Sequence, residues 1–362
     1  MRLKILILCQ NQFGTHIDTY FYCRYLRKKY QVTYIGWDYE LPRQSLEQVT
    51  IKYISRDGNI AARNIRYFRA VIEFLRSNPV DICFIKYFRG CSVLRLFFRK
   101  IQFVFDIRSG AVADNPPRRF LYDYAMWIES LFFNNVTIIS QSLAKRLRLS
   151  NKATLLPLGS VTICDHPKTF ETLDLIYAGT FTNRNLEKTI IGFAGFISNK
   201  PTSLQSSYTI IGSGHQGEEE ILRSLIKEYR LEQHVNIVGH VPFSELGKYF
   251  QKANIGISFV PKTSYFDKQP VTKTFDYFLS GMVVIGTSTY EHKLVIDESN
   301  GILIEDTSSA FKDGLTLLYE KRKQFCSQTI MQNSEVYHWK NIVHKFDKYL
   351  FKLTVGAKNN EQ

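Results

Sequence analysis

The chain has 362 residues, of which 44% are hydrophobic and 14% aromatic, and its formal net charge is +14. This length suits about two domains, and the apolar content is enough to fill two cores, which argues against a disordered chain. Residues 1–162 hold 25 Lys and Arg against 11 Asp and Glu, whereas residues 163–362 hold the remaining 22 of each. All of the positive excess therefore lies in the N-terminal half, which indicates an anionic partner for that half alone.

The cysteines and the apolar runs narrow the class of protein. Six cysteines are scattered without a short C-x-x-C spacing, so we expect buried or free thiols in a reducing compartment and no metal or redox site. The apolar stretch at the N-terminus is too short for a signal peptide, and no small-residue cleavage site follows it. No run approaches the roughly 20 apolar residues that span a bilayer. We expect a soluble, cytoplasmic chain.

In the N-terminal half, short apolar runs alternate with helical patterns. We predict strands at 3–9, 31–36, 81–87, 102–107 and 135–140, with helices at 15–30 and 59–78 among the segments between them. Strands that are apolar on both faces and alternate with helices are typical of a parallel α/β sheet.

The same alternation begins again in the C-terminal half. We predict strands at 173–179, 207–212, 235–239, 255–260 and 282–286, and helices at 185–199, 217–230, 243–253 and 272–281. Two doubly wound domains, 1–162 and 163–335, are the simplest account. An amphipathic helix at 336–355 has an apolar stripe that suits either domain, and we assign it to the N-terminal one. Residues 356–362 read as a loose tail.

One lysine stands where a helix does not favour it. In "PVTKTFDYFLSG", Lys273 falls in the first turn of a helix for which Thr272 is a reasonable N-cap. The positive end of the helix dipole disfavours a cation there unless an anion joins it. The alternative is a local ion pair with Asp276, three residues on, worth a few tenths of a kcal/mol.

Two glycine turns precede this helix in the same half. One strand runs into Gly212-Ser213-Gly214, and another ends at Gly179 and is followed by Arg184. Such turns are common in any α/β fold and are weak signals alone. Together with Lys273 they predict an anion site at the carboxyl edge of the second sheet.

These pieces, in this order, resemble the GT-B glycosyltransferases, most closely the large retaining group called family 4. The resemblance covers most of residues 135–300. It includes "VTIISQSLAKRL", "TLLPLG", "LDLIYAGTFTNRNLEKTIIGFAGF", "YTIIGSGHQGEEEIL" and "TKTFDYFLSGMVVIG". It implies two Rossmann-like domains that face each other across a cleft.

The resemblance also implies a nucleotide-sugar donor in the C-terminal domain, held by cations with neither a metal ion nor a cofactor. Lys273 and the backbone amides near Thr274 would hold the diphosphate, and Asp276 matches the family's ribose-binding acid. The donor-binding residues implied or predicted in this way are Gly14, Gly179, Gly212, Gly214, Gly239, His240, Val241, Thr272, Thr274 and Asp276.

The chain departs from the family pattern in two places. The first of two paired acids is replaced by Lys268, and the usual Arg and Lys after the glycine of "YAG" are replaced by Thr180 and Asn185. Arg184 is the candidate substitute cation, with a surface arginine as the alternative.

In the N-terminal half, Gly14 lies where the family contacts donor phosphate or acceptor. His16 beside it is an acceptor-side candidate; the alternatives are a helix cap or a solvated side chain. Asp106, Arg108 and Ser109 leave a predicted strand end, and Arg108 and Ser109 are further acceptor-side candidates. Asp106 would orient a sugar hydroxyl or take the acceptor's proton; the alternative is an Asp–Arg pair that braces a loop.

Basic and aromatic residues interleave at 24–30, 63–69, 93–100 and 118–124. We interpret these stretches as a surface for anionic lipid, with ordinary solvated helix faces as the alternative. The resemblance implies a retaining glycosyltransferase, and this surface would place it at the inner face of the plasma membrane. It would move a sugar from a UDP- or GDP-sugar to a lipid-linked acceptor in bacterial surface polysaccharide synthesis. The rival functions are a sugar-nucleotide epimerase, a non-catalytic nucleotide-sugar binder and a nucleic-acid-binding protein. The groove-reading and aromatic-sheet motifs that nucleic-acid recognition favours are not evident.

Overall fold

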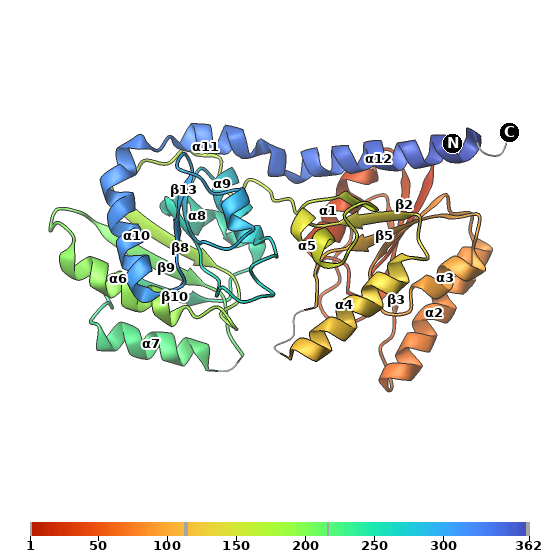
Figure 1. The fold of residues 1–362 in the computed structure, drawn as a ribbon, viewed down its shortest axis with the longest axis horizontal. Coiled ribbons are helices and arrows are strands. Elements are labelled where there is room, and N and C mark those ends of the chain that lie inside the picture. Colours follow the sequence, from red (N-terminus) through yellow and green to blue (C-terminus); the bar gives the residue numbers. More distant parts are fainter. Residues whose placement is uncertain (1, 112–114, 216, 360–362) are drawn as a thin grey trace. The chain divides into compact units, whose positions relative to one another are not determined.

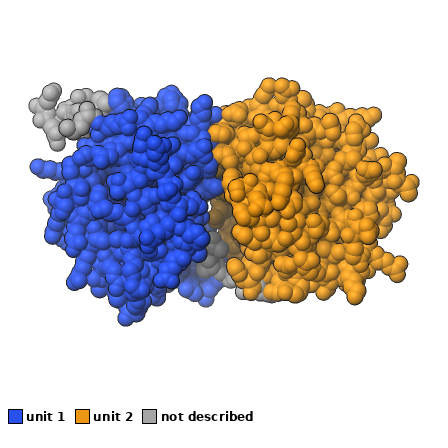
Figure 2. Space-filling view, turned by 180° about the vertical axis from the view of Figure 1, so that it is seen from behind, with its two compact units in different colours: residues 1–158, 339–362 blue, residues 159–338 orange. Residues whose placement is uncertain are grey.

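The computed structural model describes residues 2–111, 115–215 and 217–359. The chain forms two compact units, which Figure 2 shows in different colours. Unit 1 comprises residues 1–158 and 339–362, and unit 2 comprises residues 159–338. The two units are built in the same way, as a parallel sheet with helices on both faces (Figure 1). The predicted class, two doubly wound α/β domains, is confirmed.

In the described part of unit 1, seven parallel strands form one sheet in the order β3-β2-β1-β4-β5-β6-β7. The strands are β1 Lys4–Leu8, β2 Gln31–Trp37, β3 Val49–Ile54, β4 Ile82–Lys86, β5 Gln102–Ile107, β6 Asn135–Ile138 and β7 Ala153–Leu155. The strand order reverses between β1 and β4. In open α/β sheets, ligands bind at such a reversal, beyond the carboxyl ends of the strands.

Helices cover both faces of this sheet because its strands are apolar on both faces (Figure 1). They are α1 Ile17–Leu26, α2 Ile60–Ser77, α3 Ser92–Phe97, α4 Pro116–Ser130, α5 Gln141–Arg146 and α12 Trp339–Asn359. On β1, Leu6 and Leu8 pack in the cluster that α2 to α5 complete. On the other face, Phe84 of β4 contacts Tyr22 of α1 and Phe346 of α12.

The last helix belongs to unit 1, although its sequence follows unit 2. The Trp339 ring stacks on Phe21 with centroids 5.6 Å apart and meets Tyr22 edge-on, also at 5.6 Å. Further along the helix, the Asp347 carboxylate accepts the Tyr30 hydroxyl at 2.7 Å and pairs with Lys29. The helix continues through residues 356–359, which we had predicted as tail, and residues 360–362 lie outside the described residues.

Unit 2 repeats the plan with six parallel strands in its described part, in the order β10-β9-β8-β11-β12-β13. The strands are β8 Leu173–Ala178, β9 Ser206–Ile211, β10 Val235–Gly239, β11 Ile255–Ser258, β12 Val283–Thr287 and β13 Gly301–Ile304. The helices are α6 Glu187–Asn199, α7 Glu218–Glu228, α8 Gly247–Lys252, α9 Thr272–Leu279, α10 Ser308–Lys321 and α11 Ser327–Ser334. Here the reversal falls between β8 and β11, immediately before the helix that carries Lys273.

The first residues of unit 2 lie earlier in the chain than the predicted boundary at 163. The Ser160 amide donates to the Tyr337 carbonyl at 2.8 Å, and Ser160 forms a β-bridge with His338. These backbone contacts join Ser160 to the segment just before α12, and both segments belong to unit 2.

The cysteines and the lengths of the apolar helices can also be compared with the sequence predictions. All six cysteines are free thiols, five of them buried, as predicted. Among the described residues, no helix is both long enough and apolar enough to cross a bilayer.

We predict that Trp339→Ala lowers the free energy of unfolding by about 3–5 kcal/mol, because it removes a buried ring that is 1% exposed between two aromatic partners. Phe351 on the same helix is 60% exposed and serves as the control, with an expected change within about 0.5 kcal/mol for Phe351→Ala. Urea denaturation of both variants measures the difference. Equal destabilisation by the two substitutions would contradict the packing described for α12.

Candidate functional site

Three glycine turns of unit 2 meet at the carboxyl edge of its sheet. The Gly179 amide donates to the Ile211 carbonyl at 2.9 Å, and the Gly212 amide donates to the Gly239 carbonyl at 2.8 Å. Gly212 has φ +141°, and a Cβ there would lie 1.8 Å from the Gly179 carbonyl oxygen. Only glycine fits this close backbone approach. The turns after β8, β9 and β10 therefore form one continuous edge.

Helix α9 begins beside this edge, and its N-terminus has no side-chain cap. The N-cap is Val271, in an extended conformation, and Thr272 is the first helical residue, so the prediction of Thr272 as N-cap is wrong. The Thr274 amide donates to the Val271 carbonyl at 3.2 Å, so it is already engaged, contrary to the diphosphate contact expected there. The amides of Thr272 and Lys273 precede it in the first turn, where helix geometry provides no intrahelical acceptor.

The Lys273 ammonium is the most unusual group in unit 2. Within the described residues its Nζ is buried and has no hydrogen-bond partner. It lies 3.5 Å from the centroid of the Tyr177 ring and against Gly179, where a Cβ would approach Nζ to 2.9 Å. Burial holds the pKa of Lys273 well below its ordinary value, and the positive charge of Arg184 lowers it further, while Asp276 opposes these effects.

The local ion pair with Asp276 that was the alternative for Lys273 is not formed. Asp276 instead accepts a hydrogen bond from the Ser160 hydroxyl. Burial raises the pKa of Asp276 to about 6, with the Ser160 bond and the Lys273 charge acting the other way. The protonated Lys273 ammonium therefore has no carboxylate in direct contact among the described residues.

The second predicted cation, Arg184, lies close enough to act on Lys273. Its neighbours Asn183 and Asn185 both have left-handed backbone, with φ of 57° and 52°. Asparagine tolerates this region better than most residues, and two such positions in one short turn mark local strain. The turn directs the Arg184 guanidinium over the Phe266 ring, 4.4 Å from its centroid.

A buried histidine that the sequence analysis missed supports the start of α9. The His292 Nδ1–H donates to the Thr287 carbonyl at 2.7 Å, which leaves Nε2 as an acceptor. The Ser258 and Thr274 hydroxyls lie 3.0 and 3.2 Å from Nε2 and 2.8 Å from each other. Burial lowers the pKa of His292 to about 4, so it stays neutral near pH 7. The Thr274 side chain consequently faces the core and positions the helix rather than a ligand.

The remaining donor-side residues divide into two groups. Gly214 leads into α7, whose first turn holds three glutamates, and a Cβ at Gly214 would lie 2.4 Å from a Glu218 carboxylate oxygen. These acids already complement the helix dipole, so this turn is unsuited to a phosphate. In contrast, Gly239 has φ +83° with open space where a Cβ would lie, and His240 beyond it is exposed, with Val241 half-buried.

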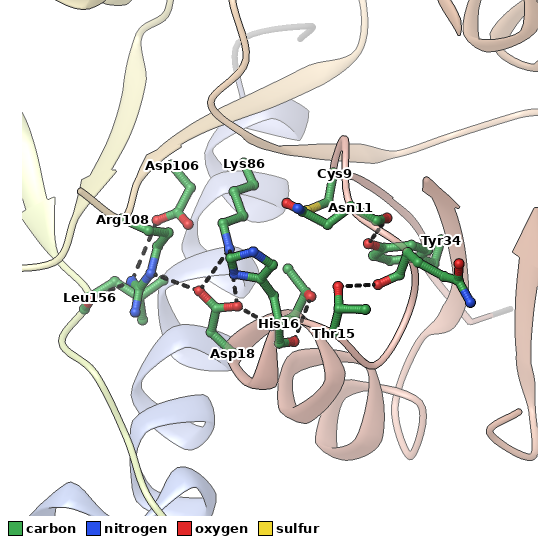
Figure 3. A network of polar contacts seen from close by, with 12 residues as sticks. Cys9, Asn11, Thr15, His16, Asp18, Tyr34, Lys86, Asp106, Arg108 and Leu156 are labelled. Carbon is green, nitrogen blue, oxygen red and sulfur yellow. Dashed lines mark hydrogen bonds and ion pairs between the residues drawn. The ribbon is translucent and has the colours of Figure 1, made fainter. Parts of the chain in front are cut away.

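A second polar cluster lies at the strand reversal of unit 1 (Figure 3). Lys86 at the end of β4 lies 3.3 Å from both Asp18 carboxylate oxygens and 2.9 Å from Nδ1 of His16. Arg108, just after β5, brings its Nε to 3.2 Å from Asp18 and its Nη1 to 3.7 Å from Asp106. The four charged groups therefore form a chain of alternating sign, in the order Asp106, Arg108, Asp18 and Lys86.

Asp106 and Arg108 are buried, which changes the role predicted for them. Asp106 has no exposed surface and accepts the Thr137 hydroxyl at 2.7 Å, and burial raises its pKa to about 6. Arg108 donates to the Leu156 carbonyl at 2.7 Å. The alternative interpretation, an Asp–Arg pair that braces a loop, fits these contacts. The prediction of Asp106 as a catalytic group in contact with the acceptor does not.

The exposed members of the unit 1 site are His16 and Ser109. Gly14 has φ +89°, and a Cβ there would overlap the Gln44 side chain at 2.3 Å, so this turn also requires glycine. The sequence analysis missed Asp18 and Lys86. A charged residue that ends a buried strand, as Lys86 does in "DICFIK", was the available signal for one of them.

No protein-family model and no curated protein sequence matches this chain. Solved structures do resemble it. Sucrose-phosphate synthase from Thermosynechococcus elongatus has a TM-score of 0.73 at 16% identity, covering 98% of this chain and all of that one. Anabaena HepE in complex with UDP and glucose has 0.72 at 12%, covering 97% and 100%. The apo lipopolysaccharide outer core galactosyltransferase WaaB has 0.68 at 12%, covering 97% and 99%. At these identities the likeness shows the fold, which is that of the GT-B glycosyltransferases.

We predict that Asp106→Asn flattens the pH dependence of stability between about pH 4 and 6. In that range folded Asp106 holds a proton that the unfolded chain releases, because its pKa is about 6 when folded and about 3.9 when unfolded. Its contribution to the free energy of unfolding therefore falls as pH rises through this window. Asp18 adds little there, because its pKa is lowered below the ordinary value.

Asparagine keeps an acceptor for Thr137 but cannot titrate. The free energy of unfolding of the variant should therefore rise relative to that of the parent protein as pH rises from 4 to 6. Urea midpoints of both proteins across this range measure the difference. A difference that does not change with pH would contradict the raised pKa of Asp106.

Proposed function

We propose that this chain is a retaining glycosyltransferase that moves a sugar from a UDP-sugar to a lipid-linked glycan acceptor. The observation that carries the proposal is the buried Lys273 ammonium without a hydrogen-bond partner among the described residues, at the uncapped N-terminus of α9. Burying an unpaired ammonium is costly, and a second cation nearby, Arg184, adds to the cost. A diphosphate supplies the missing charge.

The donor would occupy the carboxyl edge of the unit 2 sheet. Lys273, Arg184 and the first amides of α9 would hold the diphosphate and stabilise its charge as the glycosidic bond breaks, without a metal ion. Asp276 would accept hydrogen bonds from ribose hydroxyls, and the open turn at Gly239–Val241 would lie along the base. The UDP and glucose in the HepE structure support a UDP-sugar as donor.

Unit 1 would provide the acceptor side and a face for anionic lipid. Helices α3 and α4 are adjacent, because the Glu129 carboxylate of α4 accepts the amides of Gly90 and Ser92 at the start of α3. Both helices expose large apolar side chains among basic ones. These are Leu96, Phe97, Phe120 and Leu121, beside Arg95, Arg99, Lys100 and Arg118. Exposed apolar side chains beside cationic ones on each of these helices suit an anionic lipid interface.

We predict that Lys273→Met reduces transfer from the accepted UDP-sugar by at least about 100-fold, because the leaving diphosphate loses its buried cation. UDP should stabilise the parent protein against thermal unfolding, by about 2.7 kcal/mol at 100 times its dissociation constant, and should stabilise the variant much less. Without UDP, the variant should melt at a higher temperature than the parent, since it no longer buries a cation.

Lys188→Met is the matched control, since the Lys188 ammonium is already bound to the Asp306 carbonyl and should not contact the donor. Equal stabilisation of the parent and Lys273→Met by UDP would remove Lys273 from the donor site. No stabilisation of the parent by any nucleotide-sugar would remove the proposed function.

We predict that replacing Phe120 and Leu121 by Ser weakens co-sedimentation with phosphatidylglycerol vesicles, since these side chains are 63% and 62% exposed among arginines. Binding of the parent should weaken with added salt and be small on phosphatidylcholine. Leu294→Ser in unit 2, where the side chain is 60% exposed, is the control and should leave binding unchanged. The membrane part of the proposal fails if the control and the double variant behave alike.

A further inference from the structure

His16 stands at the start of α1 but does not cap it. It occupies the N-cap position with extended backbone, φ −107° and ψ 114°, and its side chain makes no capping hydrogen bond. Its imidazole turns instead toward the end of β4, where Nδ1 lies 2.9 Å from the Lys86 ammonium (Figure 3). The alternative interpretation of His16 as a helix cap is therefore wrong.

This contact determines which imidazole nitrogen holds the proton. A lysine ammonium only donates hydrogen bonds, so Nδ1 of His16 must be the acceptor. In the neutral ring the hydrogen then lies on Nε2, the nitrogen that Lys86 does not contact. The state of His16 is thus set by a side chain from another strand.

Lys86 is itself held in place by charge. Both Asp18 carboxylate oxygens lie 3.3 Å from its Nζ, and Asp18 also lies 3.2 Å from Arg108. Asp106 pairs with the far side of Arg108 at 3.7 Å. The ammonium therefore cannot swing away from His16 without losing Asp18, in a place where water is largely excluded.

Burial and the Lys86 charge together favour the neutral form of His16. Burial lowers the pKa of His16, the positive charge of Lys86 lowers it further, and Asp18 opposes them. The Cys9 thiol, just after β1, faces the same cluster and stays protonated, because burial raises its pKa. A ring that remains neutral and carries its proton on Nε2 is a hydrogen-bond donor at that nitrogen and cannot accept a proton there.

We propose that Lys86 is a positioning residue that fixes His16 as an Nε2–H donor to an oxygen of the bound sugar substrate, a hydroxyl or phosphate oxygen, and that His16 does not act as a base. His16 is exposed at the carboxyl edge of the sheet, at the reversal between β1 and β4, where ligands of such sheets bind. The inference rests on the proposed function for the identity of the substrate, but not for the protonation state of His16.

Nitrogen NMR of the full chain with ¹⁵N-labelled histidine tests the protonation state without any substrate. The chain has eight histidines, and the signals missing from His16→Gln identify those of His16. The expected result is an unprotonated Nδ1 and a protonated Nε2 through neutral pH. In Lys86→Met, loss of the ammonium leaves Asp18 as the nearer charge, so the pKa of His16 should rise and its two neutral forms should mix.

Lys86→Arg is the control, because a guanidinium also only donates and should preserve the Nε2–H form. A protonated Nδ1 in the parent protein would overturn the proposal. So would a Lys86→Met variant that melts like the parent yet leaves the form and pKa of His16 unchanged.

Activity assays test the donor role. Glutamine places an N–H near the position of the imidazole Nε2, whereas glutamate places an acceptor there, so His16→Gln should keep at least a tenth of kcat/KM and His16→Glu should lose about 100-fold. If the oxygen belongs to the donor, hydrolysis of UDP-sugar without acceptor falls in the same order; if it belongs to the acceptor, only transfer falls. Equal loss in both variants, or a pH profile with an acidic limb that His16→Gln removes, would contradict the proposal.

A chain whose NMR results hold but which transfers no sugar would refute the proposed function and leave the Lys86–His16 inference standing. The reverse pattern, active enzyme with a freely titrating His16, would refute the inference alone.

Discussion

One unfavourable feature dominates unit 2: an ammonium is buried with no hydrogen-bond partner in the part of the chain that the structure describes. Lys273 sits at the positive end of α9, over the Tyr177 ring and near the Arg184 guanidinium. The ring attracts a cation, but it does not replace the lost water. Stability alone would favour an apolar residue here. A lysine in this position is best explained by an anion that binds to it.

The topology explains why both candidate sites lie where they do. In each unit the strand order reverses once, between β1 and β4 or between β8 and β11. At such a point neighbouring strand ends send their helices to opposite faces, which leaves a space between the connecting turns. His16 and Lys86 lie at one reversal, and Gly179 and Lys273 lie at the other. The same backbone arrangement thus presents a neutral donor in one unit and an unpaired cation in the other.

The sequence predicted much of this fold because both sheets are buried on both faces. Apolar runs such as 102–107 and 282–286 alternate with helices, and every strand predicted from such a run exists. Strands β3, β7 and β13 were missed, and all three lie at sheet edges. The burial of β3 also alternates, so it lacks a continuous apolar run. The helix at 336–355 was identified from its stripe. Its stripe alone allowed either domain, because the partners that decide the choice, Phe21 and Tyr22, are more than 300 residues away.

The sites were less predictable, since a side chain's partner depends on register between strands. Lys273 was found because its charge conflicts with its local position, and a local conflict is visible in sequence. Lys86 and Asp18 conflict with nothing locally; they meet only because β1 and β4 are neighbours in the sheet. Asp106 was misjudged for the same reason, because its burial beneath Arg108 depends on β5 lying inside the sheet.

The most direct test of the central claim is proton uptake when UDP binds. Because the pKa of Lys273 is depressed in the free protein, a diphosphate beside it should raise that pKa and draw a proton from the buffer. Titration calorimetry in buffers of different ionisation enthalpy should show uptake by the parent protein, affinity that falls as pH rises, and neither effect in Lys273→Met. Equal proton uptake by the two proteins would contradict the account.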